Sequence, residues 1–186
     1  MLSELIKSKT KISKEELDVV LSFFKPIFKE KNELLLSPDV VANQLYFIKK
    51  GCLRLYYIND GQSIATRFMA FENTFLTSMV SFISREPSTE YIQTMECSEL
   101  LSISYNDFQY LRKTIPAWEN IYIYILEYGL TVINSKLNTL LTKSASERYL
   151  DLLKNNRQLI QRLSNANLAS YLNISPETLS RLKSQI

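Results

Sequence analysis

The sequence predicts an α+β chain, with an N-terminal β-roll and flanking helices, a long helix after the roll, and a C-terminal helix-turn-helix. Short apolar and aromatic runs alternate with turn residues from Glu33 to Tyr105, which is typical of a β-sandwich or roll. An apolar repeat at helical spacing starts at Pro116, and two short apolar-periodic segments separated by a turn close the chain. We therefore expect three parts: a β-roll sensor or effector domain (1–115), a dimerisation helix (116–142) and a DNA-binding helix-turn-helix (143–186).

The composition supports a folded core and argues against several kinds of chemistry. Hydrophobic residues make up 46% of the 186 residues, with eleven Tyr and nine Phe, so disorder is not expected. The chain contains no His, which removes the commonest metal ligand and general base. A β-roll enzyme of the cupin type needs a metal held mostly by His, so we expect no enzyme and no metal site.

The two cysteines and the apolar runs bear on the compartment. Cys52 and Cys97 are far apart, and we expect two free core cysteines; a thiol or oxidant sensor is the alternative. The first residues have no apolar signal region, and the longest strongly apolar run, 121–126, is too short to span a bilayer. We therefore expect a cytoplasmic protein.

Positive charge is concentrated at the C-terminal end. The net charge is +3, but the residues from Lys154 onward carry +4 and the remainder −1. This asymmetry indicates a polyanionic partner. The charged residues of this segment are Lys154, Arg157, Arg162, Arg181 and Lys183, with Glu177 as the single anion.

The N-terminal half divides into helical and strand-like segments. Apolar residues follow helical spacing over 4–30, and we expect Pro26 to break this helix. The run CLRLYYI, the turn Asn59-Asp60-Gly61 and the run SIATRF predict a β-hairpin. A short helix is expected within 73–84, and further strands within 88–104.

The long helix carries an apolar seam. Pro116 suits the first turn of a helix that runs to Leu141. Seam residues follow one another at spacings of 4, 3, 4 and 3, while Ile121 and Ile125 lie on a neighbouring stripe. A helix that is apolar on two faces needs two partners, and we expect the second to be another copy of the chain; burial of both faces within the chain is the alternative. The seam consists of Leu126, Leu130, Ile133, Leu137 and Leu140.

A further helix follows the seam. Ser144 and Glu147 have the S-x-x-E spacing of a capping box, in which each side chain bonds the other residue's backbone N–H. We expect Leu150 and Leu153 to face inward from this helix.

The last segment has the pattern of a helix-turn-helix. With Asn165 at its first position, small Ala169 falls where the two helices cross, and Asn173 falls at the turn, where the backbone has positive φ. Ser175 then caps the second helix and Pro176 enters its first turn. A generic helical hairpin would explain the apolar positions alone, which are Leu168, Leu172, Ile174, Leu179 and Leu182.

The second helix would present its first turns to the major groove of DNA. Arg181 can donate twice to guanine, and Glu177 can accept from cytosine N4; stabilisation of the helix N-terminus is the alternative role of Glu177. Ser180 can bond a base edge or a phosphate, and Arg162 is a further candidate for phosphate contact. The predicted DNA-binding residues are Ser175, Glu177, Thr178, Ser180, Arg181, Lys183 and Ser184.

This order of elements resembles the CRP/FNR transcription regulators over nearly the whole chain. YFIKKGCLRLYY and LIQRLSNANLASYLNISPETLSRL are similar to the compact, cyclic-nucleotide-binding-domain-like versions common in Bacteroidetes. The resemblance implies a cyclic-nucleotide-binding-like jelly roll, a homodimer, a palindromic operator and contact with RNA polymerase. Glu177, Ser180 and Arg181 match the base-reading positions of the FNR-type branch, which implies half-sites with a TGA-like core. The wing usual after the recognition helix is missing, so the helix-turn-helix lacks a full wing.

The chain departs from the family where its members bind small molecules. Cyclic-nucleotide binders carry a Gly-Glu pair and a downstream Arg-Ser/Thr-Ala element. The corresponding stretches of this chain are 71–75, which lacks the Gly-Glu pair, and 87–90, which lacks the arginine. Glu90 would repel a cyclic phosphate. Arg85 could replace the missing arginine of the site, but a role as an ordinary surface arginine is the favoured interpretation. We expect no cAMP, iron–sulfur or haem site, because the N-terminal cysteine cluster and His are also missing; the effector is unknown.

A second function class stays open from the sequence. The chain could be a DNA-independent dimeric ligand-sensing or adaptor module whose C-terminal hairpin contacts protein. The salt dependence of duplex binding separates the two classes, because a DNA reader loses affinity steeply with salt.

Overall fold

The computed structural model describes residues 1–59 and 63–185. Its contacts divide the chain into two compact units, one formed by 1–55 and 70–129 and the other by 56–69 and 130–186. The turn residues Asp60 and Gly61 of the predicted hairpin lie outside the described residues, and the three-part functional division stays a prediction.

Two short helices begin the first unit. α1 spans Leu2–Lys9 and α2 spans Lys14–Ser22. Ser13 starts α2 with a capping box: its hydroxyl accepts the Glu16 N–H at 3.1 Å, and the Glu16 carboxylate accepts the Ser13 N–H at 2.9 Å. This reciprocal pair satisfies two backbone donors that the helix leaves unbonded.

After α2 the chain forms a strand, although the apolar residues of the sequence continue at helical spacing. β1 spans Lys25–Lys29 and pairs antiparallel with β8, from Lys25 opposite Ser102 to Lys29 opposite Ser98. The prediction of helix beyond Ser22 is therefore wrong. Pro26 is compatible with β1 because this strand lies at the edge of its sheet, and the pairing with a distant strand overrides the local spacing.

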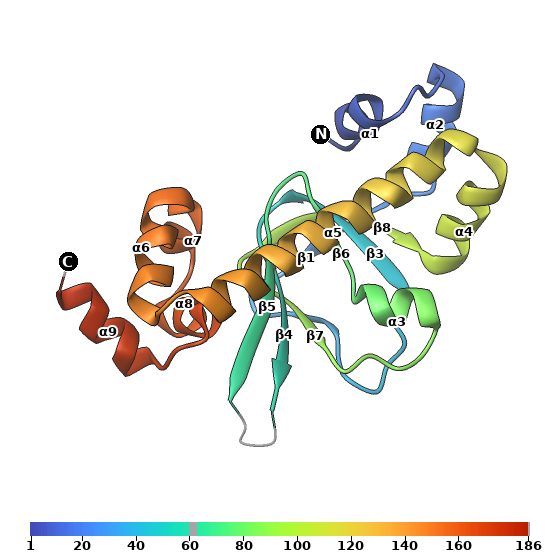
Figure 1. Ribbon diagram of the computed structural model, residues 1–186. Helices are drawn as coiled ribbons and strands as arrows, with labels where there is room; N and C mark the ends of the chain where they lie inside the picture. The colour runs from blue at the N-terminus through green and yellow to red at the C-terminus, as the bar shows by residue number, and fades with distance from the viewer. Residues whose placement is uncertain (60–62, 186) are drawn as a thin grey trace. The chain divides into compact units, whose positions relative to one another are not determined.

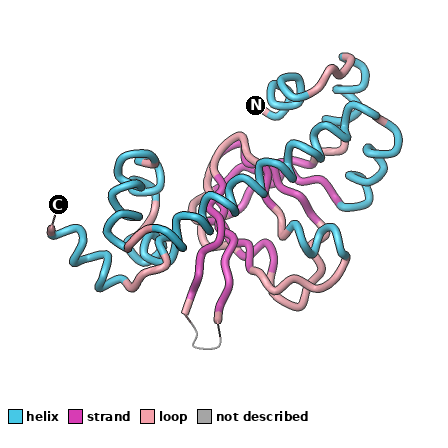
Figure 2. Tube along the Cα trace, in the orientation of Figure 1, coloured by secondary structure: helices cyan, strands magenta, loops and turns pink. Residues whose placement is uncertain are grey.

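The strands form two four-stranded sheets, with orders β1-β8-β3-β6 and β2-β7-β4-β5. Figure 1 labels these strands except β2, and Figure 2 distinguishes strands from helices by colour. The predicted β-roll is confirmed. The remaining strands are β2 (Leu34–Leu36), β3 (Gln44–Lys50), β4 (Leu53–Ile58), β5 (Ile64–Ala70), β6 (Phe75–Leu76), β7 (Tyr91–Thr94) and β8 (Ser98–Ser104).

A short helix lies between β6 and β7. α3 spans Met79–Ser84, so the expected helix within 73–84 is confirmed only for its second half. Phe75 pairs with Phe47 in β3 instead, with ring centroids 5.2 Å apart.

The two cysteines are both free, but their environments differ. Cys52 is fully buried, as expected for a core cysteine, whereas Cys97 is exposed and its thiol lies 3.3 Å from a carboxylate oxygen of Glu30. The expectation that Cys97 is a core residue is therefore wrong. It stands just before β8, where the chain enters the sheet from the surface.

Helices follow the roll. α4 spans Tyr105–Thr114 and α5 spans Pro116–Thr142, which confirms the long helix and the place of Pro116 at its start. Trp118, Ile121 and Ile125 are buried in the first unit, which confirms the second apolar stripe. The boundary between the two units falls inside α5, between Gly129 and Leu130.

Four helices complete the second unit: α6 (Ala145–Asn155), α7 (Arg157–Arg162), α8 (Asn165–Leu172) and α9 (Pro176–Ser184). The capping box at Ser144 and Glu147 is confirmed. The inward side of α6 carries Tyr149 and Leu152, whereas Leu150 is 47% exposed and Leu153 is half-buried. The prediction for Leu150 and Leu153 is therefore wrong: α6 packs on α7 and α8 through the neighbouring face.

Within the described ranges, no helix combines the length and apolar character that a membrane crossing requires.

Candidate nucleic-acid interface

The turn between α8 and α9 has the backbone geometry that the sequence predicts. Asn173 has φ 55° and ψ 49°, in the left-handed region, and its N–H donates to the end of α8. The next N–H, of Ile174, reaches the Ala169 carbonyl at 3.1 Å. Asn tolerates this conformation better than other residues with a side chain. The two helices are therefore joined by a tight turn of defined geometry.

The packing between α8 and α9 also follows the prediction. Ala169, at the helix crossing, is fully buried, so its small side chain lets the two helices approach closely. Ile174, in the turn, is half-buried. The other apolar positions, Leu168, Leu172, Leu179 and Leu182, are all buried.

The start of α9 is fixed by its own hydroxyl groups. The Ser175 hydroxyl accepts the Thr178 N–H at 3.1 Å and lies 3.2 Å from the Thr178 hydroxyl, and Pro176 is the first helical residue. This confirms Ser175 as the helix cap. Two of the predicted DNA-binding residues thus have a structural role within the protein, and their contact with DNA stays a prediction.

The remaining predicted DNA-binding residues lie on the exposed side of α9, away from buried Leu179 and Leu182. Glu177, Ser180, Arg181, Lys183 and Ser184 are all exposed. The Lys183 ammonium donates to the Asn165 side chain at the start of α8, and the Ser184 hydroxyl donates to the Arg181 carbonyl at 2.8 Å. Glu177, Ser180 and Arg181 therefore lie on an exposed surface of α9, and their contact with DNA stays a prediction.

The Glu177 carboxylate is stabilised at the first turn of α9. Hydrogen bonds from the Ser175 side chain and from the Glu177 backbone lower the pKa of this carboxyl below its ordinary value of 4.5. The helix dipole acts in the same direction. The structural role that the sequence offers for Glu177 is thus present, and it leaves the carboxylate available as an acceptor.

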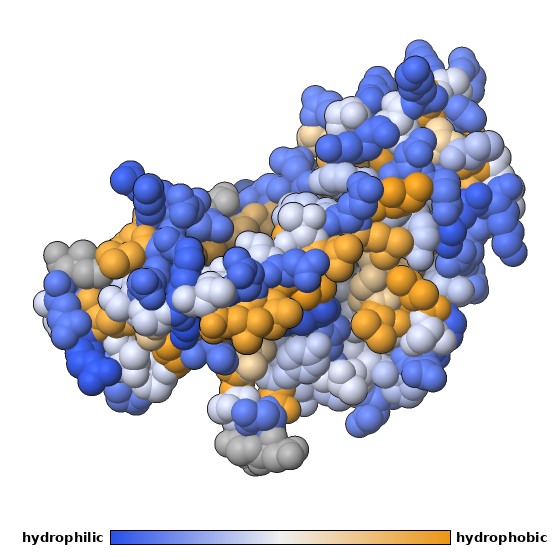
Figure 3. Space-filling view, viewed as in Figure 1, coloured by the Kyte–Doolittle hydropathy of each residue, from blue (hydrophilic) through white to orange (hydrophobic). Residues whose placement is uncertain are grey.

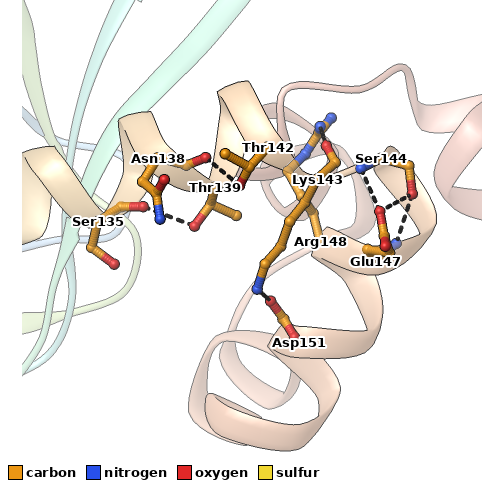
Figure 4. A network of polar contacts seen from close by, with 9 residues as sticks. All are labelled: Ser135, Asn138, Thr139, Thr142, Lys143, Ser144, Glu147, Arg148 and Asp151. Carbon is orange, nitrogen blue, oxygen red and sulfur yellow. Dashed lines mark hydrogen bonds and ion pairs between the residues drawn. The ribbon is translucent and has the colours of Figure 1, made fainter.

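Arg148 positions the helix-turn-helix and was not identified from the sequence. Its Nη1 donates to the Lys143 carbonyl at 2.8 Å, and its Nε donates to the Leu172 carbonyl at 3.1 Å. One guanidinium therefore joins the end of α5 to the end of α8, where a cation is favoured at the helix C-terminus. Figure 4 shows Arg148 beside Lys143 at the joint between α5 and α6.

A pair of hydroxyl groups links β5 to α8. The Ser170 hydroxyl accepts the Thr66 N–H at 3.1 Å, donates to the Ile64 carbonyl at 2.8 Å and lies 2.7 Å from the Thr66 hydroxyl. Both partners belong to the second unit. The hairpin end is thus bonded to the first helix of the helix-turn-helix, which no local pattern in the sequence indicates.

Lys136 of α5 makes further contacts with β5 and α8. Its ammonium donates to the carbonyls of Thr66 and Arg67 and lies 4.4 Å from the centre of the Tyr171 ring. Burial, with a smaller contribution from the charge of Arg67, lowers the pKa of Lys136 to about 8. The one signal in the sequence is a lysine placed between seam residues of an otherwise uncharged helix segment.

The predicted dimer seam lies largely open to solvent. Leu130 is 62% exposed, Ile133 42% and Leu137 50%, whereas Leu126 and Leu140 are half-buried. Figure 3 shows apolar side chains over the second half of α5. An isolated chain therefore leaves this face without internal cover, which argues against the alternative that both faces of α5 are buried within one chain.

Two side chains near the expected cyclic-phosphate segments are engaged elsewhere. The Glu72 carboxylate accepts the Gly51 N–H at 2.8 Å. Arg85 donates to the carbonyls of Ala42 and Phe82 and to the Asn43 side chain. Arg85 thus holds the loop before β3 rather than reaching toward residues 87–90.

The second segment contains a buried carboxylate. Glu90 is 3% exposed and accepts a hydrogen bond from the Ser78 hydroxyl. The Glu90 N–H donates to the Ser88 hydroxyl at 2.9 Å, and Ser88 in turn donates to Ser78 at 3.1 Å. The segment that the family resemblance matches to the phosphate-binding arginine thus presents a buried carboxyl group that is hydrogen-bonded within the protein.

Within 1–59 and 63–185, the structure brings together no group of three or more His, Cys, Asp or Glu side chains that could hold a metal ion.

Comparison with known proteins supports both the roll and the overall element order. Residues 27–114 match the family model of the cyclic nucleotide-binding domain. No curated protein matches the chain in sequence.

Several solved structures share the fold. The c-di-GMP-responsive global regulator CLP of Xanthomonas campestris is 19% identical, with a TM-score of 0.78 over 93% of this chain and 91% of that one. FixK2 of Bradyrhizobium japonicum is 16% identical, with a TM-score of 0.76 over 87% and 83%. The catabolite activator protein of Thermus thermophilus is 20% identical, with a TM-score of 0.60 over 94% and 84%. Residues 27–114 therefore match the cyclic nucleotide-binding domain family, and the chain has the fold of the CRP/FNR transcription regulators.

Proposed function

We propose that the protein is a homodimeric, sequence-specific DNA-binding transcription regulator of the CRP/FNR type, and not an enzyme. The observation that carries this proposal is the tight turn at Asn173, which joins a buried α8–α9 contact to an exposed face with Glu177, Ser180 and Arg181. In a helix-turn-helix, such a face enters the major groove and reads base edges.

The exposed seam of α5 supports the homodimer. Leucine and isoleucine side chains at heptad spacing are costly to leave in water and are covered when a second helix packs on them. A two-fold dimer would place two copies of α9 on two half-sites about 34–36 Å apart. The operator is therefore expected to be palindromic, with a TGA-like half-site, and RNA polymerase is the expected protein partner.

We also propose that the roll does not bind cAMP and that the protein uses no iron–sulfur cluster or haem. The buried Glu90 carboxylate and the internal bonds of Glu72 and Arg85 support this for cAMP. Calorimetric titration with cAMP tests it, and binding in the micromolar range would contradict it.

Selection of duplexes from a random pool tests the central proposal. We expect enrichment of a palindrome, and a log–log dependence of affinity on salt with a slope of about −0.9 for each phosphate contacted. Running the selection with and without cell extract shows whether an effector is needed. Weak binding without sequence preference would instead support an adaptor that does not act on DNA.

A further inference from the structure

The joint between α5 and α6 opens into a cavity of about 490 Å³, whose walls come from α5, α6 and α8. All the lining residues belong to the second unit. The volume lies within the range of roughly 300–1,000 Å³ that is typical of small-molecule sites. The cavity is therefore large enough for a ligand of the size of a mononucleotide.

Two of the cations that line the cavity lie in the segment where α5 ends and α6 begins. α5 ends at Thr142 and α6 begins at Ala145, so the two helices diverge from this joint. Lys143 and Arg148 line the cavity near the joint, and Asn155 lines it at the other end of α6. In Figure 4 the Lys143 ammonium lies beside Asp151, whereas the Arg148 guanidinium lies at the Lys143 main chain.

The lining carries three cations and one carboxylate. The cations are Lys136, Lys143 and Arg148, and the carboxylate is Asp151. Arg148 uses Nε and Nη1 for the carbonyls of Leu172 and Lys143, and neither of these bonds involves Nη2. Lys143 pairs with Asp151 across the cavity, and both side chains remain about two-fifths exposed, at 40% and 41%. Such a partly exposed pair is worth little, so an anion can compete for the Lys143 ammonium.

The remaining walls suit an organic body attached to that anion. Val132 and Leu140 of α5 and Leu152 of α6 are apolar, and the Tyr171 ring adds an aromatic face. Ser135 and Thr139 contribute hydroxyl groups along the same side of α5. This mixture of apolar wall and a few polar groups is the usual lining of a small-molecule site.

We propose that this joint cavity binds a small phosphorylated ligand of mononucleotide size, with its phosphate on the Lys143 ammonium. The phosphate would replace Asp151 as the partner of Lys143, and Arg148 and Lys136 would add positive charge to the lining. The site is distinct from the cyclic nucleotide-binding domain of residues 27–114, and the proposal concerns binding, so it does not depend on DNA recognition.

Titration calorimetry on the full chain tests the proposal with three probes: inorganic pyrophosphate, adenosine 5′-monophosphate and adenosine. We expect both phosphorylated probes to bind and adenosine not to bind. Lys143→Met should weaken binding about tenfold, because a charge-assisted hydrogen bond is lost. The matched control is Lys154→Met, which removes a lysine of the same helix region that does not line the cavity, and it should leave the affinity unchanged.

A second variant is expected to tighten binding instead of weakening it. Asp151→Asn removes the carboxylate that competes for Lys143. It should therefore tighten pyrophosphate binding roughly 3- to 10-fold. Damage to the fold cannot produce tighter binding, so this variant separates a lost site from a misfolded protein. The proposal is overturned if neither phosphorylated probe binds at millimolar concentration, if Lys143→Met and Lys154→Met bind equally, or if Asp151→Asn weakens binding. Competition by duplex DNA alone, without binding of the small probes, would also overturn it and assign the cations to the DNA backbone.

Discussion

The hydroxyl oxygens of Thr66 and Ser170 lie 2.7 Å apart, although the two residues are 104 positions apart in the sequence. This contact joins the hairpin strand β5 to α8, the first helix of the helix-turn-helix. Together with the bonds from the Lys136 ammonium to the carbonyls of Thr66 and Arg67, it ties three elements of the second unit to one another. The helix-turn-helix is thus held by more than its own internal packing.

Replacing Ser170 with Ala should destabilise the protein. Ser170→Ala removes the bonds to the Thr66 N–H and the Ile64 carbonyl. The expected loss in the free energy of unfolding is about 1–2 kcal/mol, because two backbone groups lose their partner. Urea denaturation measures it. Ser180→Ala, on the exposed side of α9, is the matched control and should change stability by less than about 0.5 kcal/mol. Equal effects of the two variants would mean that the β5–α8 contact contributes nothing.

Replacing Arg181 with Ala should weaken recognition of the selected operator. Loss of a side chain that donates twice to a guanine costs about 1–3 kcal/mol and relaxes the preference at one base step. Fluorescence anisotropy with the operator and single-step variants of it measures both effects. Arg157→Ala removes the same charge from an exposed position outside α9 and should keep the sequence preference. If Arg181→Ala retains wild-type affinity and preference, Arg181 does not read a base.

Placing a charge in the α5 seam should abolish the dimer. Leu137 is 50% exposed in the isolated chain, and an aspartate there would be buried without a partner between two helices. Leu137→Asp is therefore expected to sediment as a monomer in analytical ultracentrifugation. Asn134→Asp adds the same charge to an exposed residue of α5 outside the seam and should remain dimeric. A dimer that tolerates Leu137→Asp would exclude this face as the interface.

The buried ammonium of Lys136 should make stability rise at alkaline pH. Its pKa is about 8 in the folded protein, against an ordinary value of 10.5. Between these pH values the unfolded chain binds a proton that the folded chain has released, so the free energy of unfolding increases with pH. The increase is at most about 3 kcal/mol.

The comparison with Lys136→Met isolates this effect. Tyr46, whose pKa burial raises to about 12, acts in the opposite direction: the folded chain keeps its proton longer, and stability falls as the pH passes 10. That contribution is common to both proteins and cancels in their difference. Urea denaturation at pH 7.5 and pH 10 should show a larger gain for the wild type, whereas an identical pH dependence of the two proteins would contradict the assignment.

Local patterns in the sequence predict the helical half of this protein well. Pro116 and the apolar repeat place α5 almost to the residue, and Asn173 and Ser175 identify the turn and the cap, because each of these features depends on neighbours within a few positions. The same kind of pattern fails at β1, where Phe24 and Phe28 have helical spacing but the pairing with β8 decides the conformation.

The parts of the candidate interface that the sequence does not predict depend on long-range contacts. Arg148 reaches Leu172 across 24 positions, and the Thr66–Ser170 pair is more distant still. On α6, the choice between Tyr149 and Leu150 as the inward residue is set by the position of α7 and α8, not by the capping box. Spacing alone identifies which residues could be buried, and packing against other elements decides among them.

The division of the chain has a practical consequence for dissection of this protein. The chain passes from one compact unit to the other inside β4, β5 and α5, so every crossing lies within a regular element and none in a linker. A fragment that starts in α5 would keep the helix-turn-helix but lose Thr66 and the rest of the hairpin. The helix-turn-helix therefore cannot be released together with its hairpin by a single proteolytic cut, and transferring it to another protein would require the hairpin to be transferred with it.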